Sequence, residues 1–264
     1  MRSPVTAADA LIDQYLEGRS ALVTASSRNL GAAIATNLAG HGATVCVQYH
    51  QSEAVASRLV QTLSERTRRQ HVAVPGDMSD PTSVRAMTRE AESLLGGGID
   101  ILVNNAGPFS MTPYAKLPET EWDLIWNANV KACYLTSQSV AGGMRKRGWG
   151  RIVNISAGSA YLRNHSIYSL AKNGLIFLTE ELALELGPEI TVNAVSPGQI
   201  AESAEDIAPY DPTFVERAIE HTPAGRLVSR AEVAEVVSLL CAPAFAMVTG
   251  ATVPIDGGWR LNRF

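Results

Sequence analysis

Tyr168 and Lys172, which stand four residues apart, are the pair in this sequence best suited to acid–base chemistry. Residues at that spacing on a helix lie one turn apart on the same face. A phenol with its ordinary pKa of about 10 is a poor acid or base at neutral pH. A neighbouring ammonium stabilises the phenolate and lowers the phenol pKa. The pair is therefore suited to a tyrosine that exchanges a proton with a substrate oxygen.

Residues 24–31 have the composition of a turn that holds a pyrophosphate. Small residues between a strand and a helix let backbone amides approach a pyrophosphate at the helix N-terminus. The candidate residues of this turn are Ala25, Ser27, Arg28, Asn29, Leu30 and Gly31. Only Gly31 is a glycine, so the G-x-G-x-x-G pattern is incomplete. Taken alone, the stretch is equally compatible with an ordinary connection between a strand and a helix.

The end of the second predicted strand favours NADP(H) over NAD(H). Folds specific for NAD usually place an acid here, on the ribose 2′-hydroxyl, yet no acid occurs before Glu53. A 2′-phosphate would instead meet the guanidinium of Arg28, with further donors from Tyr49 and Ser52. The alternative for Arg28 is a solvated surface charge.

These residues must be positioned by an alternation of strands and helices that runs along most of the chain. Short apolar runs predict buried strands at 20–25, 43–49, 71–75, 99–104, 151–156, 191–196 and 251–255. Segments of helical periodicity predict helices at 30–41, 52–69, 81–95, 119–147, 168–186 and 230–241. Strict alternation predicts an α/β fold, a doubly wound parallel sheet with helices on both faces, in a single domain.

Two segments fall outside this alternation. Residues 199–225 carry several prolines and charges and are expected to form a substrate lid beyond the carboxyl ends of the strands. Residues 1–18 are expected to be an appended amphipathic helix, with Ala7, Ala10, Leu11 and Leu16 on one face. The catalytic domain would then span residues 19–264.

From about residue 18 onward, the sequence resembles the short-chain dehydrogenase/reductase family. Several motifs occur in the family's order, each at the end of the correct element. They are the turn at 24–31 with Ala25 and Asn29 where glycines are usual, Asp77-Met78, Asn104-Asn105-Ala106-Gly107, Asn129-Val130, Tyr168 to Lys172, Pro197-Gly198 and Asp256-Gly257-Gly258. A tyrosine and lysine alone would carry little weight, whereas the ordered set is highly specific.

The resemblance implies a Rossmann-type sheet of about seven parallel strands, a nicotinamide coenzyme and frequently a homotetramer. It implies that Lys172 also holds the nicotinamide ribose and that Asn129 anchors a water on a proton relay. The coenzyme contacts implied elsewhere are Asp77 and Met78 at the adenine, Asn105, Ala106 and Gly107 beside the coenzyme, and Pro197, Gly198 and Ile200 at the carboxamide.

The sequence departs from the family at the serine that polarises the substrate oxygen. Ala157 occupies that position in register with the strand. Because side chains alternate along an extended chain, Ser159 is the favoured replacement, and Ser156 is the other candidate. Alternatively no serine acts, and Tyr168 alone, a water, His165 or Ser166 holds the oxygen. A second departure follows Pro197-Gly198, where Ser203 could replace a threonine that usually binds the carboxamide.

Composition and charge exclude several other functions. The chain of 264 residues is 46 % apolar and has a net charge of −4, which fits a folded α/β domain and offers no basic surface for nucleic acid. Cys46, Cys133 and Cys241 are scattered, which predicts reduced thiols and neither a disulfide framework nor a zinc site. The sequence lacks a signal-peptide pattern and an apolar run of about 18 residues, so we expect a cytoplasmic protein with no membrane contact.

We therefore expect an NADPH-dependent ketoreductase that moves a hydride between the coenzyme and a carbonyl or alcohol, similar to 3-oxoacyl-carrier-protein reductases. One alternative is C=N reduction of the pteridine-reductase type, which residues 45–52 and the altered serine site resemble. Another is an NADP-binding regulator without catalysis.

The substrate and the assembly are less clearly encoded than the reaction. Helices 119–147 and 168–186 carry apolar residues on more than one face, which predicts a homo-oligomer, either a tetramer or a dimer. Candidate pocket walls for the small-molecule substrate are Pro108, Phe109, Tyr161 and Tyr210.

Overall fold

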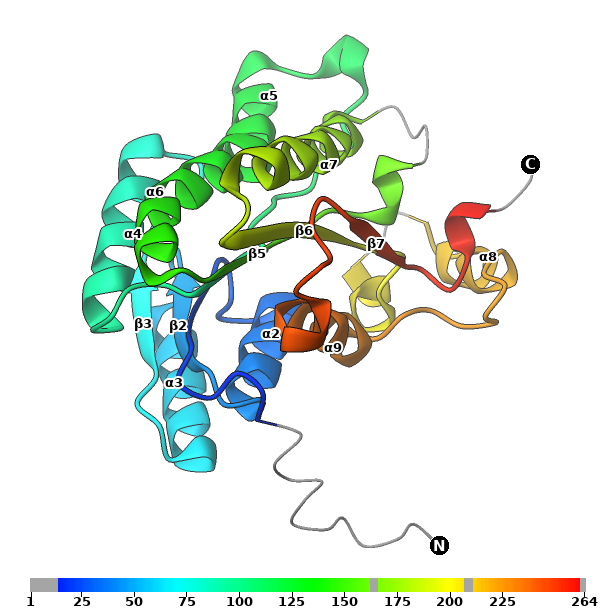
Figure 1. Ribbon diagram of the computed structural model, residues 1–264. Helices are drawn as coiled ribbons and strands as arrows, with labels where there is room; N and C mark the ends of the chain where they lie inside the picture. The colour runs from blue at the N-terminus through cyan, green and yellow to red at the C-terminus, as the bar shows by residue number, and fades with distance from the viewer. Residues whose placement is uncertain (1–13, 162–165, 207–210, 262–264) are drawn as a thin grey trace, which may run out of the picture.

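The computed structural model describes residues 14–161, 166–206 and 211–261 and contains one sheet of seven parallel strands (Figure 1). The strand order is β3-β2-β1-β4-β5-β6-β7. Their bounds are β1 Ser20–Val23, β2 Thr44–Tyr49, β3 Val72–Pro75, β4 Ile101–Asn104, β5 Gly150–Ile155, β6 Ile190–Pro197 and β7 Thr252–Ile255. The predicted doubly wound sheet is confirmed, and the strand ends differ from the expected ones by one or two residues.

The order of the strands reverses between β1 and β4, which pair with Val23 beside Val103. In an open parallel sheet, ligands bind beyond the carboxyl ends of the strands at such a switch point. The segments that follow β1 and β4 are the predicted pyrophosphate turn and the Asn104-to-Gly107 motif. The topology therefore brings these two motifs to one edge of the sheet.

Helices cover both faces of the sheet. Their bounds are α2 Asn29–Gly40, α3 Glu53–Thr67, α4 Pro81–Leu94, α5 Glu119–Trp126, α6 Ala132–Arg147, α7 Ile167–Leu186, α8 Phe214–Glu220 and α9 Arg230–Cys241. Figure 1 shows α2, α3 and α9 on one side, and α4, α6 and α7 on the other.

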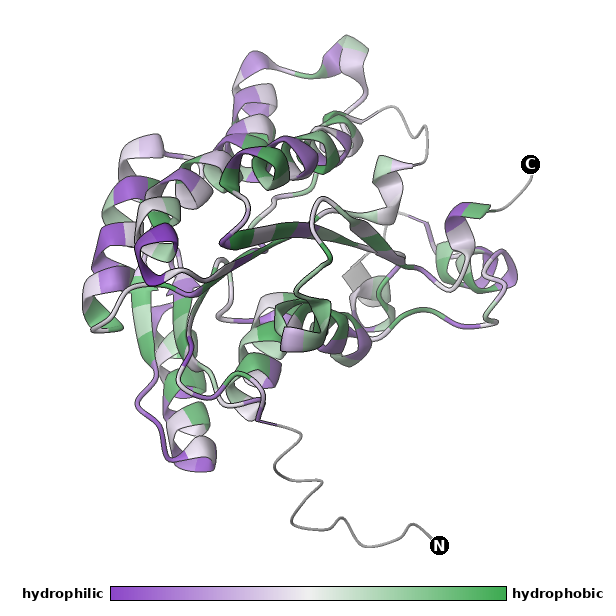
Figure 2. Ribbon diagram, in the orientation of Figure 1, coloured by the Kyte–Doolittle hydropathy of each residue, from purple (hydrophilic) through white to green (hydrophobic). Residues whose placement is uncertain are grey.

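Each face of the sheet has its own apolar core. Val23 packs with Ile34 of α2 and Val237 of α9, whereas its neighbour Leu22 packs with Leu135 of α6. Because successive strand side chains point to opposite faces, a strand that is covered on both sides must be apolar at nearly every position. Figure 2 shows the strands as mostly green and the helices on both faces in alternating bands of green and purple.

The long helix expected at 119–147 is interrupted, which corrects that prediction. The chain runs as α5, then a π-helical turn over Asn127–Lys131, then α6. A π-turn inserts an extra residue into the helix, and such turns are frequent at functional sites. Asn129 lies within this turn.

The two irregular segments are only partly described. Within 199–225, Ala201–Asp206 form a 3₁₀ turn and α8 is a helix that was not predicted. Ala204 and Ala218 make a small apolar cluster with Leu227, which follows this segment. Residues 14–18 form turns instead of the expected helix, because Leu16 is fully buried and its N–H donates to the carbonyl of His41. Ala7, Ala10, Leu11, His165 and Tyr210 lie outside the described residues.

No helix in the described part of the chain combines the length and the apolar character needed to cross a bilayer. Cys46, Cys133 and Cys241 are buried free thiols.

Candidate active site

The first two turns of α7 carry Tyr168 and Lys172 to the carboxyl end of β5. The side chain of Ser166 caps this helix by accepting from the N–H of Ser169 at 3.2 Å, so Tyr168 lies in the first turn. Lys172 is buried, and its Nζ donates to the carbonyl of Ile155, the last residue of β5, at 2.8 Å. The same Nζ lies 5.5 Å from the centre of the Tyr168 ring.

Burial dominates the electrostatics of this pair. It raises the pKa of the Tyr168 phenol to about 12 and lowers the pKa of the Lys172 ammonium to about 8, because each charged form is deprived of water. The expectation that Lys172 by itself lowers the pKa of Tyr168 is therefore wrong for the protein without coenzyme. The physical reason is burial, which disfavours the phenolate; the Nζ of Lys172 meanwhile donates to the Ile155 carbonyl.

Asn129 lies in the same site, beside the space that a side chain at Gly107 would fill. A side chain at Gly107 would overlap the Oδ1 of Asn129, and its Cβ would lie 2.8 Å from the Nζ of Lys172. The amide nitrogen of Asn129 donates to the carbonyls of Pro108 and Ile125 at 3.0 and 2.9 Å. Its Oδ1 is buried and accepts no hydrogen bond from any described residue. A buried acceptor without a partner is rare, so this oxygen fits a bound water or hydroxyl group.

The predicted pyrophosphate turn keeps the backbone shape of a glycine-rich turn although two glycines are replaced. Ala25 and Asn29 adopt left-handed φ angles of 49° and 53°, a region that favours glycine. A Cβ on Gly31 would collide with the carbonyl of Ala25 and lie 2.7 Å from the Nδ2 of Asn105. Asn105 in turn donates from Nδ2 to the carbonyls of Thr24 and Ala25 at 3.0 and 3.2 Å.

A family model described as Enoyl-(Acyl carrier protein) reductase matches residues 24–260. The chain is 37 % identical to the 3-oxoacyl-[acyl-carrier-protein] reductase FabG of Pseudomonas aeruginosa, over 94 % of this chain and 99 % of that protein. The chain belongs to the short-chain dehydrogenase/reductase family. It is an oxidoreductase of that family, and the predicted resemblance is confirmed.

Solved structures of similar proteins contain both nicotinamide coenzymes. A gluconate 5-dehydrogenase from Burkholderia cenocepacia in complex with NADP and tartrate has a TM-score of 0.88 and 28 % identity, covering 96 % of this chain and all of that one. A 7α-hydroxysteroid dehydrogenase complexed with NADH and 7-oxo glycochenodeoxycholic acid has a TM-score of 0.87 and 29 % identity, covering 94 % of this chain and 96 % of that one. The choice between NADP and NAD therefore depends on this enzyme's own residues.

At the substrate-oxygen position of this dehydrogenase/reductase, the structure separates the two candidate serines. Ser156 is buried and its Oγ donates to the backbone carbonyl of Lys172 at 2.9 Å, so it ties β5 to α7. Ser159 lies in the 3₁₀ turn Gly158–Ala160, and its Oγ is buried without a hydrogen-bond partner among the described residues. Asn173 of α7 donates to the carbonyl of Ala160 at 3.2 Å, which packs this turn on the catalytic helix.

The predicted 2′-phosphate side of the enzyme has free donors. Arg28 is exposed, and its guanidinium makes no ion pair or hydrogen bond with any residue in the described ranges. Ser52 precedes α3 without using its side chain as a cap. Tyr49 ends β2 and is half-buried. Ser27, by contrast, is nearly buried at 9 % exposure.

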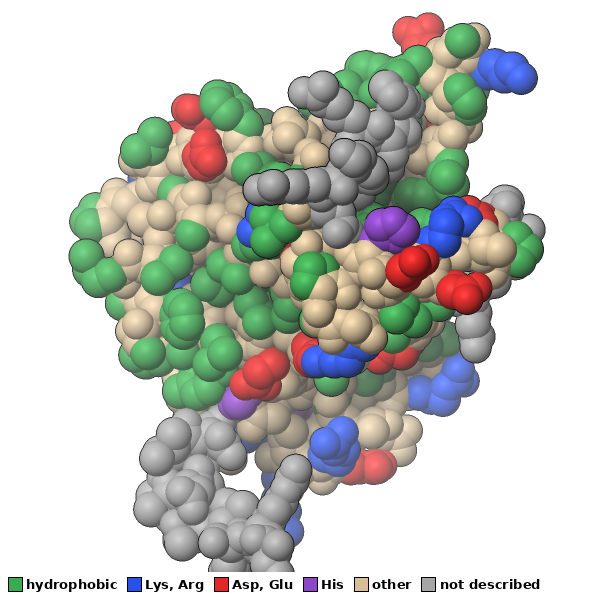
Figure 3. Space-filling model, turned by 90° about the vertical axis from the view of Figure 1, so that its right-hand side faces the viewer, with side chains coloured by type: hydrophobic (Ala, Val, Ile, Leu, Met, Phe, Trp, Pro, Cys, Tyr) green, Lys and Arg blue, Asp and Glu red, His purple; other side chains and the backbone are tan. Residues whose placement is uncertain are grey.

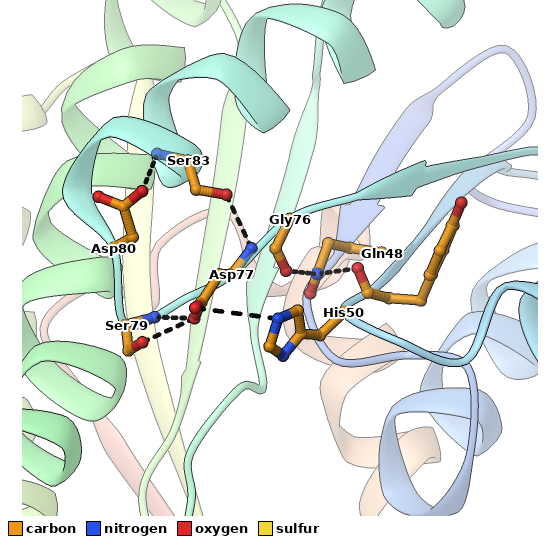
Figure 4. A network of polar contacts seen from close by, with 8 residues as sticks. Gln48, His50, Gly76, Asp77, Ser79, Asp80 and Ser83 are labelled. Carbon is orange, nitrogen blue, oxygen red and sulfur yellow. Dashed lines mark hydrogen bonds and ion pairs between the residues drawn. The ribbon is translucent and has the colours of Figure 1, made fainter.

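Two residues that the sequence analysis did not single out lie at this edge, Gln48 and His50 (Figure 4). The Nε2 of His50 lies 3.8 Å from the Oδ2 of Asp77. The Oδ1 of Asp77 accepts from the N–H and the hydroxyl of Ser79 at 2.8 and 2.7 Å, and these bonds lower the pKa of the Asp77 carboxyl. An amide within an otherwise apolar strand was the signal in the sequence that could have identified Gln48.

The coenzyme contacts predicted after β6 are engaged in different ways by neighbouring segments. The N–H of Gly198 donates to the carbonyl of Ile255 at 3.0 Å, and a Cβ on Gly198 would lie 2.8 Å from the Cβ of Asp256, so the turn after β6 packs closely on the chain after β7. Ile200 forms a bridge with Val228. Ser203 is occupied elsewhere, since its Oγ accepts from the Nη2 of Arg230 at 3.2 Å, which argues against the suggested carboxamide contact.

Other residues that the sequence analysis singled out lie in the two apolar cores or beside Tyr168. Met78 is 9 % exposed and packs in the core between the sheet and α4, and Ala106 belongs to the same core. Leu30 packs against the opposite core. Phe109 meets the ring of Tyr168 edge-on, with the ring centres 5.1 Å apart, and is 57 % exposed.

Proposed function

We propose that this enzyme is an NADPH-dependent ketoreductase. The observation that carries the proposal is the arrangement around Gly107, where the open acceptor of Asn129 meets the buried ammonium of Lys172, which stands one turn of α7 after Tyr168. Such a set can deliver a proton to a substrate oxygen and replace it afterwards.

When bound, the coenzyme supplies the hydride. The hydroxyl of Tyr168 donates the proton that neutralises the developing alkoxide. The ammonium of Lys172 stabilises the phenolate that remains, and the Oδ1 of Asn129 holds a water through which Lys172 is reprotonated. Ser159 donates the hydrogen bond that polarises the carbonyl oxygen, because its hydroxyl is not engaged by the described residues, whereas that of Ser156 is.

We propose NADP(H) rather than NAD(H) because Arg28 presents a guanidinium without a carboxylate partner in the described structure. The planar guanidinium suits a phosphate, with which it forms paired hydrogen bonds. The other proposed coenzyme contacts are those of the turn after β1 (Ala25, Ser27, Asn29, Leu30, Gly31), of the adenosine side (Tyr49, Ser52, Asp77, Met78), of the chain after β4 (Asn105, Ala106, Gly107) and of the chain after β6 (Pro197, Gly198, Ile200).

The coenzyme proposal is tested by comparing Kd values for NADPH and NADH. We expect Arg28→Gln to weaken NADPH binding about tenfold or more, as for one lost charge-assisted contact, and to leave NADH binding nearly unchanged. Arg66→Gln, at an exposed position in the last turn of α3 and so at the opposite end of that helix from Ser52, is the matched control. An equal loss for both coenzymes would remove the 2′-phosphate role.

The reaction itself is tested by NADPH oxidation with a β-ketoacyl thioester and, in parallel, with a dihydropterin. Turnover of the thioester that is abolished in Tyr168→Phe supports the ketoreductase. Turnover of the pterin alone would support the C=N alternative, which Ala157 at the usual serine position motivates. A biological role that survives in Tyr168→Phe would indicate a regulator instead.

We also propose a homo-oligomer that is formed through α7. Three large apolar side chains of this helix are exposed, namely Leu170 at 43 %, Phe177 at 63 % and Leu184 at 82 %. Figure 3 shows hydrophobic side chains gathered on the left part of the face it draws. Exposed apolar patches mark interfaces. Light scattering is expected to give a dimer or tetramer for the unmodified chain and a smaller species for Leu184→Glu.

A further inference from the structure

The side chain of Gln48 lies between the turn after β1 and the chain after β3, at the proposed adenosine side of the coenzyme site. It is 1 % exposed, and every hydrogen-bonding group of its side chain is used. The Oε1 accepts from the N–H of Ala25 at 2.7 Å. The Nε2 donates to the carbonyls of Tyr49 and Gly76 at 2.7 and 2.8 Å. Figure 4 shows this amide between the end of β2 and Gly76, with Asp77 next along the chain.

The partners fix the orientation of this amide. The Ala25 N–H can only donate, so the amide oxygen must face it, and the two carbonyls can only accept, so the amide nitrogen must face them. A flipped amide would place hydrogen against hydrogen and oxygen against oxygen. One side chain therefore sets the spacing between the turn after β1 and the chain after β3.

Ala25 is the residue that depends on this bond most. Its φ of 49° lies in the left-handed region, which costs free energy for any residue with a Cβ and none for glycine. Its carbonyl accepts from the Nδ2 of Asn105 at 3.2 Å. Among the described residues, the side chain of Gln48 is the one partner of its N–H.

We propose that Gln48 is a positioning residue for the coenzyme: its amide holds Ala25 in the conformation that a glycine would adopt unaided, and so preserves the pyrophosphate turn. This rests on the proposed function, since it assumes that the turn holds NADP(H). Without the amide, Ala25 relaxes toward negative φ, and the N–H groups of the turn lose their common direction. A glycine at position 25 removes the dependence.

The test is a double-mutant cycle on NADPH binding, measured by fluorescence titration at low temperature and accompanied by melting curves. Gln48→Met keeps the length and burial of the side chain and loses its three hydrogen bonds; we expect the Kd to rise about tenfold, equivalent to about 1.4 kcal/mol. Adding Ala25→Gly to Gln48→Met is expected to recover about threefold or more of that loss. Gln61→Met, an exposed glutamine of α3, is the matched control and leaves the Kd unchanged.

The outcomes are distinguishable. If Gln48→Met melts at a lower temperature yet binds NADPH as tightly as the unmodified enzyme, the residue is structural only and the inference is overturned. It is equally overturned if Ala25→Gly has the same effect with and without Gln48→Met. If the unmodified enzyme does not bind NADPH, the proposed function fails and the inference with it. Should Gln48→Met not fold, Gln48→Asn serves in its place, because its shorter amide cannot reach both Ala25 and Gly76. This variant must show the same coupling to Ala25→Gly.

Discussion

Lys172 donates to the carbonyl of Ile155 and leaves the phenol of Tyr168 without a direct ionic partner in the described structure. Burial disfavours the charged form of both groups, so the tyrosine is neutral, whereas the lysine, with its pKa lowered to about 8, still carries its proton at neutral pH. The coenzyme-free site therefore holds its proton on the tyrosine, which suits a reductase that must give a proton away. The lysine is the group that titrates close to working pH.

The lowered pKa of Lys172 predicts how the rate of reduction depends on pH. The pKa of Lys172 is lowered to about 8, so its charge is present below that pH and lost as pH rises through it. We expect kcat/KM for the ketone to be level near neutral pH and to fall above about pH 8. Lys172→Arg keeps its charge and should lose rate without the fall. A profile for the unmodified enzyme that rises between pH 8 and 9 would contradict the role of the ammonium.

The two serines near the site predict opposite phenotypes. Ser159→Ala removes the proposed donor to the substrate oxygen and is expected to lower kcat about 100-fold at an unchanged NADPH Kd. Ser156→Ala breaks the bond from β5 to the Lys172 carbonyl and is expected to cost about 1 kcal/mol of unfolding free energy, with the smaller effect on kcat. Steady-state kinetics and urea unfolding check both. A larger loss of kcat in Ser156→Ala would reverse the assignment.

At the scale of secondary-structure elements, helix ends and one helix defect place the catalytic groups. The cap at Ser166 sets where α7 begins and hence on which face Tyr168 lies. The π-helical turn sets Asn129, whose amide bonds to Pro108 and Ile125 turn its oxygen toward Gly107. Both devices act through backbone geometry rather than through contact with substrate.

Removing a cap from α7 is therefore expected to affect activity as well as stability. Ser166→Ala should cost about 1 kcal/mol of unfolding free energy and lower kcat, because the first turn that carries Tyr168 frays. Ser229 caps α9 in the same way, by accepting from the N–H of Glu232. Ser229→Ala should cost a similar amount and leave kcat nearly intact. Equal kcat values for the two variants would show that the α7 cap does not position Tyr168.

At the scale of the whole molecule, the doubly covered sheet buries titratable groups that have no part in the chemistry. Cys46 lies on β2, Cys133 on α6 and Cys241 at the end of α9. Burial raises the pKa of each thiol from 9.0 to about 12. In the unfolded chain these thiols ionise near their ordinary pKa, whereas in the fold they stay protonated.

This difference predicts that the enzyme is destabilised by alkali. The three thiols contribute fully below about pH 9, and their contribution is lost as pH rises, by up to about 1.4 kcal/mol per thiol and pH unit. Lys172 opposes this trend, since its lowered pKa favours the fold as pH rises above 8, but it is one group against three. Urea unfolding at pH 8 and pH 10 should show the loss. Cys46→Ala should lessen the slope, and a slope unchanged by that substitution would refute its origin.

Much of the fold and part of the site could be predicted from the sequence by itself. The alternation of apolar runs and helical segments determined the parallel sheet, since only covering both faces can bury strands as apolar as Ala21 to Val23. The spacing of Tyr168 and Lys172 determined their shared face, because that relation is local to one helix.

Only the tertiary structure decided what depends on contacts between distant segments. The local sequence does not reveal that Lys172 faces the Ile155 carbonyl. Nor does it reveal that the Ser156 hydroxyl is hydrogen-bonded while that of Ser159 has no partner in the described structure, or that Ser203 binds Arg230. Nor does local composition show that Gln48 supports Ala25. Hydrogen bonds and burial are set by residues far apart in the chain, and they determine each group's pKa and availability.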